Sequence, residues 1–332
     1  MNSAFSEGNR SPRLSTFAEL ARGGLAHADI AKLVDDGELV RLRNGVYAHA
    51  DGGESRVEDG ADRDRPAYEV RERAFLERTL AAARSIEQGT VISHGSALVL
   101  HGLPLHGVPL GLPTVTRHRS GGGSRRSTAL ICANMPLDGA VVEVDGVPVT
   151  SPARTIIDVT RTVSLESGVC AADAAIRRTL CSRRALGDEA ESAKGRTGVA
   201  RARRLPDLTS GLAESVLESL IRLVLVMAGL PEPELQVRLG VRSGARFRVD
   251  FYWQQWKLVG EADGFGKYGV SPEEIRANWI AERERQRQLE DAGYMVIRWT
   301  WQDLHRPDRI VRQVREAMRR QERLGLGPAQ AA

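Results

Sequence analysis

Three acidic residues in the last third of the chain have a spacing that suits metal-dependent hydrolysis. Asp250 stands where one predicted strand runs out, and the next strand delivers Glu261 and Asp263. Residues two apart on a strand share a face of the sheet, so two adjacent strands can bring the three carboxylates together. Carboxylates that close repel one another unless a divalent cation neutralises them. The pattern therefore predicts a site for Mg²⁺ or Mn²⁺, which are hard ions that prefer oxygen ligands.

Further polar residues could complete a site that cleaves phosphodiesters, since a bound divalent ion can activate water for in-line attack. Glu214 and Glu218 lie one helical turn apart, so one of them becomes a fourth acid if that helix face packs beside the strands. Lys267 could bring positive charge toward a phosphate. Glu282, Arg283 and Arg285 on a later helix could form a polar wall. The alternative is that each acid simply ends a strand and faces solvent.

Hydrophobic periodicity places these acids in an α/β arrangement. Gly229 followed by Pro231 ends one helix, and Ser271 followed by Pro272 and two acids starts another. The predicted order is helix, three strands, helix, strand and helix, at residues 212–229, 234–239, 246–253, 256–262, 271–291, 294–301 and 308–322. This order predicts an α/β sandwich in which adjacent strands carry the acids.

The beginning of the chain predicts a different unit, over residues 15–50. Ser15 or Thr16 can cap a helix, a second helix covers 26–36, and Asn44-Gly45 between two β-prone runs is a strong hairpin signal. Helix, turn, helix and hairpin is the order of a winged helix-turn-helix. The DNA-contacting residues that we expect in this unit are Lys32, Arg41 and Arg43, with the two arginines suited to phosphates. The second helix also carries Asp29, Asp35 and Asp36, so protein contact or a plain scaffold role is the alternative.

Composition shifts divide the rest of the chain. We expect a tail over 1–14, a Gly- and charge-rich linker over 51–66, a mixed α+β region over 67–206, the α/β sandwich over 207–324 and a second tail over 325–332. Residues 171–206 are rich in arginine, which indicates either a surface that follows phosphates or a solvated face.

The overall composition describes a globular protein with a mildly basic balance. The 332 residues are 42% hydrophobic and carry a formal net charge of +4, which permits a nucleic-acid partner without requiring one. Three widely spaced cysteines do not form a disulfide framework or a zinc motif. A polar N-terminus and the lack of a long apolar stretch predict a cytoplasmic protein that makes no membrane contact.

The last domain resembles a known group of bacterial proteins. The strings Val249-Asp-Phe-Tyr-Trp253, Leu258-Val-Gly-Glu-Ala-Asp-Gly264 and Gly293-Tyr-Met-Val-Ile-Arg-Trp-Thr-Trp301, with Glu218 before them, look like domain-of-unknown-function family 559. That family is similar to very-short-patch repair endonucleases of the PD-(D/E)XK superfamily. The resemblance covers about 110 residues and implies a restriction-endonuclease-like α/β/α sandwich with Asp250 and Glu261 as metal ligands and Glu218 as a helix-borne acid.

One residue departs from that superfamily pattern. Asp263 occupies the place of the usual lysine, which would orient or deprotonate the attacking water. An aspartate cannot supply positive charge, so three interpretations stay open. Lys267 substitutes, the mechanism depends on the metal, or the domain binds DNA without cutting it. Arg285 is a further candidate DNA contact.

The front of the chain is similar to AbiEi-type antitoxins of abortive-infection systems. Residues 15–50 look like their N-terminal winged helix, and the strings beginning at His94, His101 and Gly146 look like the continuation in actinobacterial members. The resemblance implies binding to promoter DNA and pairing with a cognate toxin protein.

Three functions therefore compete. The first is a Mg²⁺-dependent DNA endonuclease that a winged helix directs to its substrate. The second is an antitoxin-like transcriptional regulator that binds DNA without cutting it. The third is a protein-interaction role within a toxin–antitoxin locus. Oligomeric state and sequence preference are outside the reach of the sequence.

Overall fold

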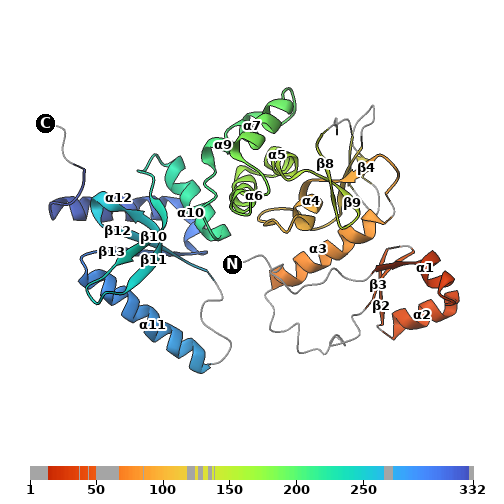
Figure 1. Ribbon diagram of the computed structural model, residues 1–332, viewed down its shortest axis with the longest axis horizontal. Helices are drawn as coiled ribbons and strands as arrows, with labels where there is room; N and C mark the ends of the chain where they lie inside the picture. Colours follow the sequence, from red (N-terminus) through yellow and green to blue (C-terminus); the bar gives the residue numbers. More distant parts are fainter. Residues whose placement is uncertain are drawn as a thin grey trace. The chain divides into compact units, whose positions relative to one another are not determined.

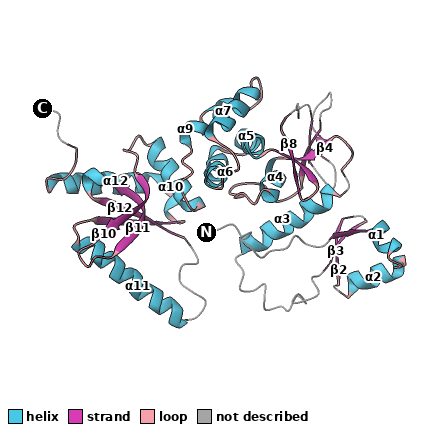
Figure 2. Cartoon of the chain, in the orientation of Figure 1, coloured by secondary structure: helices cyan, strands magenta, loops and turns pink. Residues whose placement is uncertain are grey.

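The computed structural model describes residues 14–36, 38–43, 45–49, 67–84, 86–117, 124–125, 130–133, 137, 139–264 and 272–328. Two compact units divide the chain (Figure 1). The C-terminal unit contains residues 172–180 and those from 206 onward, and the N-terminal unit contains residues 2–171 and 181–205. Helices and strands mix throughout both units (Figure 2).

The first segment of the N-terminal unit has the predicted order of two helices and a hairpin. Its elements are β1 (Leu14–Thr16), α1 (Phe17–Arg22), α2 (His27–Asp35), β2 (Leu39–Arg43) and β3 (Val46–His49), with the sheet order β1-β3-β2. The predicted cap is present, because Thr16 and Glu19 exchange reciprocal side-chain-to-backbone hydrogen bonds. Asn44 lies outside the described residues, and Gly45 has the positive φ of 75° that this turn requires. The arrangement is compatible with a winged helix.

The rest of the N-terminal unit is a six-stranded sheet with helices around it. The sheet order is β6-β7-β5-β4-β9-β8. Its hairpin β8–β9 turns at Asp145 and Gly146, which both have the positive φ that a two-residue Asp-Gly turn requires. The elements are α3 (Ala67–Ala83), β4 (Thr90–Ile92), α4 (His94–Leu100), β5 (Thr114–Arg117), β6 (Ser124–Arg125), β7 (Leu130–Ala133), β8 (Val141–Val144), β9 (Val147–Thr150), α5 (Pro152–Thr162), α6 (Leu165–Arg177), α7 (Arg183–Ser192), α8 (Val199–Arg203) and α9 (Leu205–Leu208).

The C-terminal unit contains a four-stranded sheet in the order β10-β11-β12-β13. Strands β11 and β12 are antiparallel, whereas β12 and β13 are parallel, so a crossover helix, α11, connects the parallel pair. The elements are α10 (Val216–Met227), β10 (Glu234–Gly240), β11 (Arg246–Trp253), η1 (Gln254–Trp256), β12 (Leu258–Asp263), α11 (Pro272–Asp291), β13 (Met295–Thr300), η2 (Asp303–His305) and α12 (Pro307–Arg323).

Helices cover both faces of this four-stranded sheet (Figure 1). On one face, Leu217 and Ile221 of α10 and Val314 of α12 pack against Phe251 and Trp299. On the other face, Leu289 of α11 packs with Val259 and its neighbours. This is the predicted α/β/α layering. Many unrelated activities share such layering, so it does not by itself define a nuclease.

A buried polar anchor ties the end of α6 to the C-terminal unit. Asp173 is 1% exposed, and its Oδ1 accepts hydrogen bonds from the backbone N–H groups of Ser210 at 2.7 Å and Gly211 at 3.4 Å. The guanidinium of Arg222, also 1% exposed, lies 3.6 Å from Asp173 Oδ2 and donates to the carbonyl of Leu208. A buried charge of this kind requires a partner, so Asp173 and Arg222 stabilise each other.

Candidate carboxylate site

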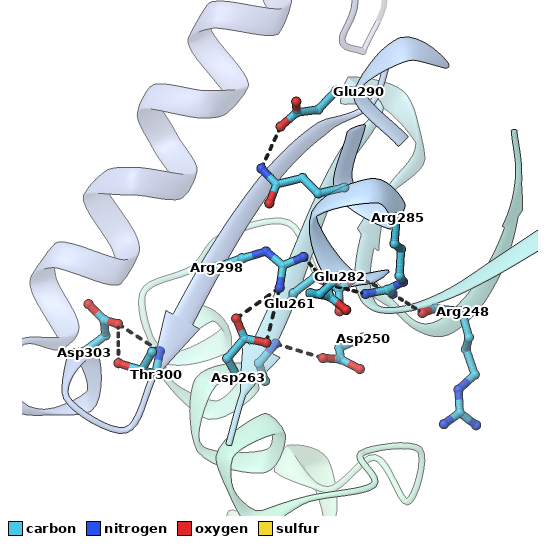
Figure 3. Close-up of polar contacts among 12 residues, drawn as sticks. Arg248, Asp250, Glu261, Asp263, Glu282, Arg285, Glu290, Arg298, Thr300 and Asp303 are labelled. Carbon is cyan, nitrogen blue, oxygen red and sulfur yellow. Dashed lines mark hydrogen bonds and ion pairs between the residues drawn. The ribbon is translucent and has the colours of Figure 1, made fainter. Parts of the chain in front are cut away.

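Strand pairing brings Asp250 and Glu261 together. Phe251 pairs with Gly260 and Tyr252 with Val259, so Asp250 and Glu261 are the next residues opposite each other on these antiparallel strands. Residues directly opposite each other project from the same face, where their Cβ atoms are about 5 Å apart. The Asp250 side chain turns to accept a hydrogen bond at Oδ2 from the backbone N–H of Ala262, 2.8 Å away (Figure 3).

An amide side chain joins Glu218 to this pair. Gln236 Nε2 donates to Glu218 Oε2 at 2.8 Å and to Asp250 Oδ1 at 3.3 Å. Glu218 also accepts from the Ser215 hydroxyl at 2.8 Å and from the backbone N–H of Glu214 at 2.9 Å. Burial and, second, the charge of Asp250 raise the pKa of Glu218 above its usual value. The predicted fourth acid is therefore Glu218, whereas Glu214 pairs with Arg248.

The backbone changes direction at Gln236. Its φ is 57°, in the left-handed region that non-glycine residues seldom occupy. Leu235 belongs to the core on the α10 and α12 face, whereas Val237, two residues on, belongs to the core on the α11 face. The normal alternation of the strand therefore breaks at Gln236. Such strain persists where surrounding contacts fix it, and here those contacts are the two carboxylates.

Glu261 is a buried acid with an arginine beside it. Its side chain is 3% exposed, and Oε1 accepts a hydrogen bond from Arg285 Nη2 at 2.7 Å. Burial and, second, the charge of Asp250 raise the pKa of Glu261 to about 7, although Arg285 opposes that rise. Glu261 therefore changes its protonation state near neutral pH.

The remaining acid, Asp263, is connected to Glu261 through a chain of ion pairs (Figure 3). Arg298 lies opposite Glu261 on the parallel strand β13, and its Nη1 is 3.1 Å from Asp263 Oδ2. Arg298 Nη2 and Arg285 Nη1 both donate to Glu282 Oε1. Arg285 of α11 thus pairs with Glu261, Arg298 of β13 pairs with Asp263, and Glu282 of α11 joins the two arginines.

The structure brings together part of the predicted site. Asp250, Glu261 and Glu218 are linked, and Asp263 and Arg285 lie beside them. Lys267 lies outside the described residues. Arg285 contacts the acids, and its role as a DNA contact stays a prediction. In the separate N-terminal segment, Lys32 and Arg41 are exposed, while only the backbone of Arg43 is described.

Sequence reasoning missed two of the residues that organise this site. Gln236 has no signal in the sequence, because an amide in a strand with mixed burial looks like any surface residue. Arg298 belongs to the segment 293–301, which carries part of the family resemblance. The sequence of that segment does not indicate that the Arg298 side chain contacts Asp263 and Glu282. Both roles depend on the register between strands, which one strand's sequence does not specify.

The fit to a divalent cation is partial. The donor set is of hard oxygens, and Gln236 Oε1 is buried without a hydrogen-bond partner among the described residues. However, a guanidinium already neutralises Glu261, and the described residues include no group of three or more His, Cys, Asp or Glu side chains arranged to hold a metal. As described, the carboxylates have amide and guanidinium partners, and the binding of Mg²⁺ or Mn²⁺ by Asp250 and Glu261 stays a prediction.

Comparison with known proteins finds a family match in the middle of the chain. Residues 88–208 match the AbiEi antitoxin C-terminal domain. Over 283 residues the chain is 28% identical to two proteins of Mycobacterium tuberculosis, "Uncharacterized protein Rv2248" of strain ATCC 25618 / H37Rv and "Uncharacterized protein MT2308" of strain CDC 1551 / Oshkosh. The similarity covers 85% of this chain and 93% of each relative.

The match to an antitoxin domain agrees with the predicted antitoxin-like middle region. It lends no support to a nuclease. Within the described residues, no helix combines the length and the apolar character that are needed to cross a bilayer.

Proposed function

We propose that this chain is a DNA-binding regulator of the AbiEi antitoxin type. The observation that carries the proposal is the match of residues 88–208 to an AbiEi antitoxin domain. The helix, helix and hairpin order of residues 14–49 supports it, because antitoxins of this type carry a winged helix before that domain. The partners are promoter DNA and a cognate toxin protein.

The carboxylate site is consistent with binding rather than cutting. Hydrolysis of a phosphodiester needs a cation or another positive group that faces the phosphate. Here the guanidinium groups of Arg285 and Arg298 are engaged with Glu261 and Asp263. Their positive charges are therefore compensated by carboxylates of the same domain.

Binding of the full chain to the DNA upstream of its own gene tests this proposal. We expect a retarded complex in a gel-shift assay, both with EDTA and with Mg²⁺, and intact strands afterwards. A complex no stronger than that with an unrelated duplex would contradict specific regulation. Arg41→Gln should make the salt dependence of binding less steep, because each lost phosphate contact removes about 0.9 from the slope. The matched control is Arg184→Gln, which removes the same charge from a highly exposed position.

A second candidate function is a DNA endonuclease dependent on Mg²⁺ or Mn²⁺. The contacts of Gln236 with Glu218 and Asp250, and the position of Glu261 opposite Asp250 on the neighbouring strand, favour it. In this proposal Asp250 and Glu261 hold the ion, and Glu218, Asp263 and Lys267 assist. A cation would have to displace Arg285 from Glu261.

A cleavage assay on supercoiled, linear and single-stranded DNA separates the two candidates. If the second is correct, the chain nicks DNA with Mg²⁺ or Mn²⁺ and Asp250→Asn abolishes the nicking. Cleavage by Asp250→Asn at the rate of the unaltered chain would exclude this site as its source.

A further inference from the structure

Helix α11 has two faces of different chemistry. The inner face carries Glu282, Arg285 and Leu289, which lie three and four residues apart and therefore share one side of the helix. Leu289 is fully buried in the core, while Glu282 and Arg285 join the ion network over the acids. The position of these residues fixes which side of α11 faces away from the sheet.

The outer face of α11 is basic and aromatic. We define it by five exposed residues that recur at helical spacing: Arg276, Trp279, Ile280, Arg283 and Arg287. Trp279 is 51% exposed and Ile280 is 54% exposed, an unusual pair of large apolar side chains to leave in water. The Arg283 guanidinium lies 4.7 Å from the centre of the Trp279 ring.

The members of this face carry three positive charges and no negative one. Among the acids beside it, Glu284 pairs with Arg287 at 3.2 Å and Glu290 accepts a hydrogen bond from Gln286. The guanidinium groups of Arg276 and Arg283 flank the exposed indole along about two turns of helix.

We infer that the outer face of α11 binds single-stranded nucleic acid. In this inference a base stacks on Trp279 while Arg276 and Arg283 contact the adjoining phosphates. The inference rests on the proposed function, because it assumes that the chain binds nucleic acid. It adds a second binding surface, in the C-terminal unit, with a different preference. A duplex keeps its base faces stacked and hidden, so the indole selects for an unpaired strand.

The test compares two probes with the full-length chain by fluorescence anisotropy. One probe is labelled oligothymidine, and the other is the labelled duplex from upstream of the gene. Trp279→Ala should weaken binding to oligothymidine about 5-fold to 150-fold, the equivalent of about 1–3 kcal/mol per stacked base. Trp279→Phe should retain most of the affinity, since phenylalanine keeps a stacking surface. Neither variant should change duplex affinity.

Two control variants distinguish the loss of base stacking on Trp279 from a general loss of binding affinity. Leu324→Ala removes a side chain that is 70% exposed just beyond the end of α12, and it should leave oligothymidine affinity unchanged. Arg283→Gln should reduce both the affinity for oligothymidine and its salt slope, whereas Arg184→Gln should not. Circular dichroism checks that each variant is folded.

Each outcome has a distinct meaning. If the chain binds the duplex but not oligothymidine, or if Trp279→Ala binds oligothymidine normally, the inference is overturned and the proposed function stands. An equal loss for both probes also overturns it, because stacking cannot account for a change on the duplex. Binding of oligothymidine through Trp279 without binding of the duplex would instead contradict the proposed function.

Discussion

Glu261 is a buried acid under two opposing influences. Burial and the neighbouring Asp250 favour its protonated form, while the Arg285 guanidinium at 2.7 Å favours its carboxylate. With the pKa raised to about 7, the first influence is the stronger. The site therefore changes charge within the range in which cells work, and a group with this property occurs more often at binding or reacting sites than elsewhere.

A pH dependence of stability follows from this raised pKa. An acid whose pKa is higher in the folded state than in the unfolded state stabilises the fold below the unfolded value. That contribution is lost as the pH rises through about 7. We expect the unaltered chain to lose about 3 kcal/mol relative to Glu261→Gln between about pH 5 and about pH 8. Urea denaturation of both proteins at the two pH values measures this difference. Parallel pH profiles for the two proteins would contradict the assignment.

The acids of the site were predictable and their partners were not. The spacing of Glu261 and Asp263 along one strand predicts a shared face, because side chains alternate along a strand. To predict that Asp250 lies opposite Glu261, one must know the register between their strands. To predict that Arg285 contacts Glu261, one must know how α11 is rotated about its axis. Tertiary packing decides both of these, so the sequence of each element alone leaves them open.

At the scale of elements, helices were predicted within a few residues, since capping residues mark their starts. The predicted helix 271–291 is α11, Pro272–Asp291. The predicted helix 212–229 begins later, at Val216, because Ser215 caps it and accepts from the Glu218 N–H. The predicted strand 256–262 also begins later, at Leu258. Trp256 continues the apolar alternation, but it belongs to a short 3-10 turn that ends at Lys257 with φ of 44°.

Strand β12 depends on the absence of a side chain at Gly260. A Cβ at this position would lie 2.6 Å from the Trp299 ring and 3.1 Å from Phe251 Cβ. We therefore expect Gly260→Ala to destabilise the C-terminal unit by about 1–3 kcal/mol through overpacking. Gly264→Ala is the matched control, because a Cβ there has no atom within 4 Å among the described contacts and its φ is not positive. Equal denaturation midpoints for the two variants would mean that the sheet adjusts without cost.

At the scale of the whole molecule, the division between the two units runs through a helix. Helix α6 begins in the N-terminal unit, and its last residues, from 172 onward, belong to the C-terminal unit. Asp173 is the first acid in that last part, and its contacts are with the buried Arg222 and the backbone near Ser210. The boundary between the two units therefore falls within one helix.

Removal of the Asp173 anchor should lower the stability of the C-terminal unit. Asp173→Ala leaves Arg222 buried with one negative partner fewer, although Glu232 remains 3.5 Å from Arg222 Nη1. The cost should therefore not exceed the roughly 3–5 kcal/mol that follows when a buried charge loses its partner. We expect a lower midpoint in urea denaturation followed by circular dichroism. Asp188→Ala removes an exposed acid, 3.8 Å from Arg184, and should change the midpoint little. An unchanged midpoint in Asp173→Ala would argue that the anchor has no energetic role.

The aromatic composition of the C-terminal unit has a spectroscopic consequence. All five tryptophans of the chain, at positions 253, 256, 279, 299 and 301, lie in that unit. When tryptophan is excited selectively, at the long-wavelength edge of protein absorption, its emission therefore comes from the C-terminal unit alone. No attached dye is needed. A change in that emission when DNA or a toxin binds would report directly on the half of the chain that contains the carboxylates.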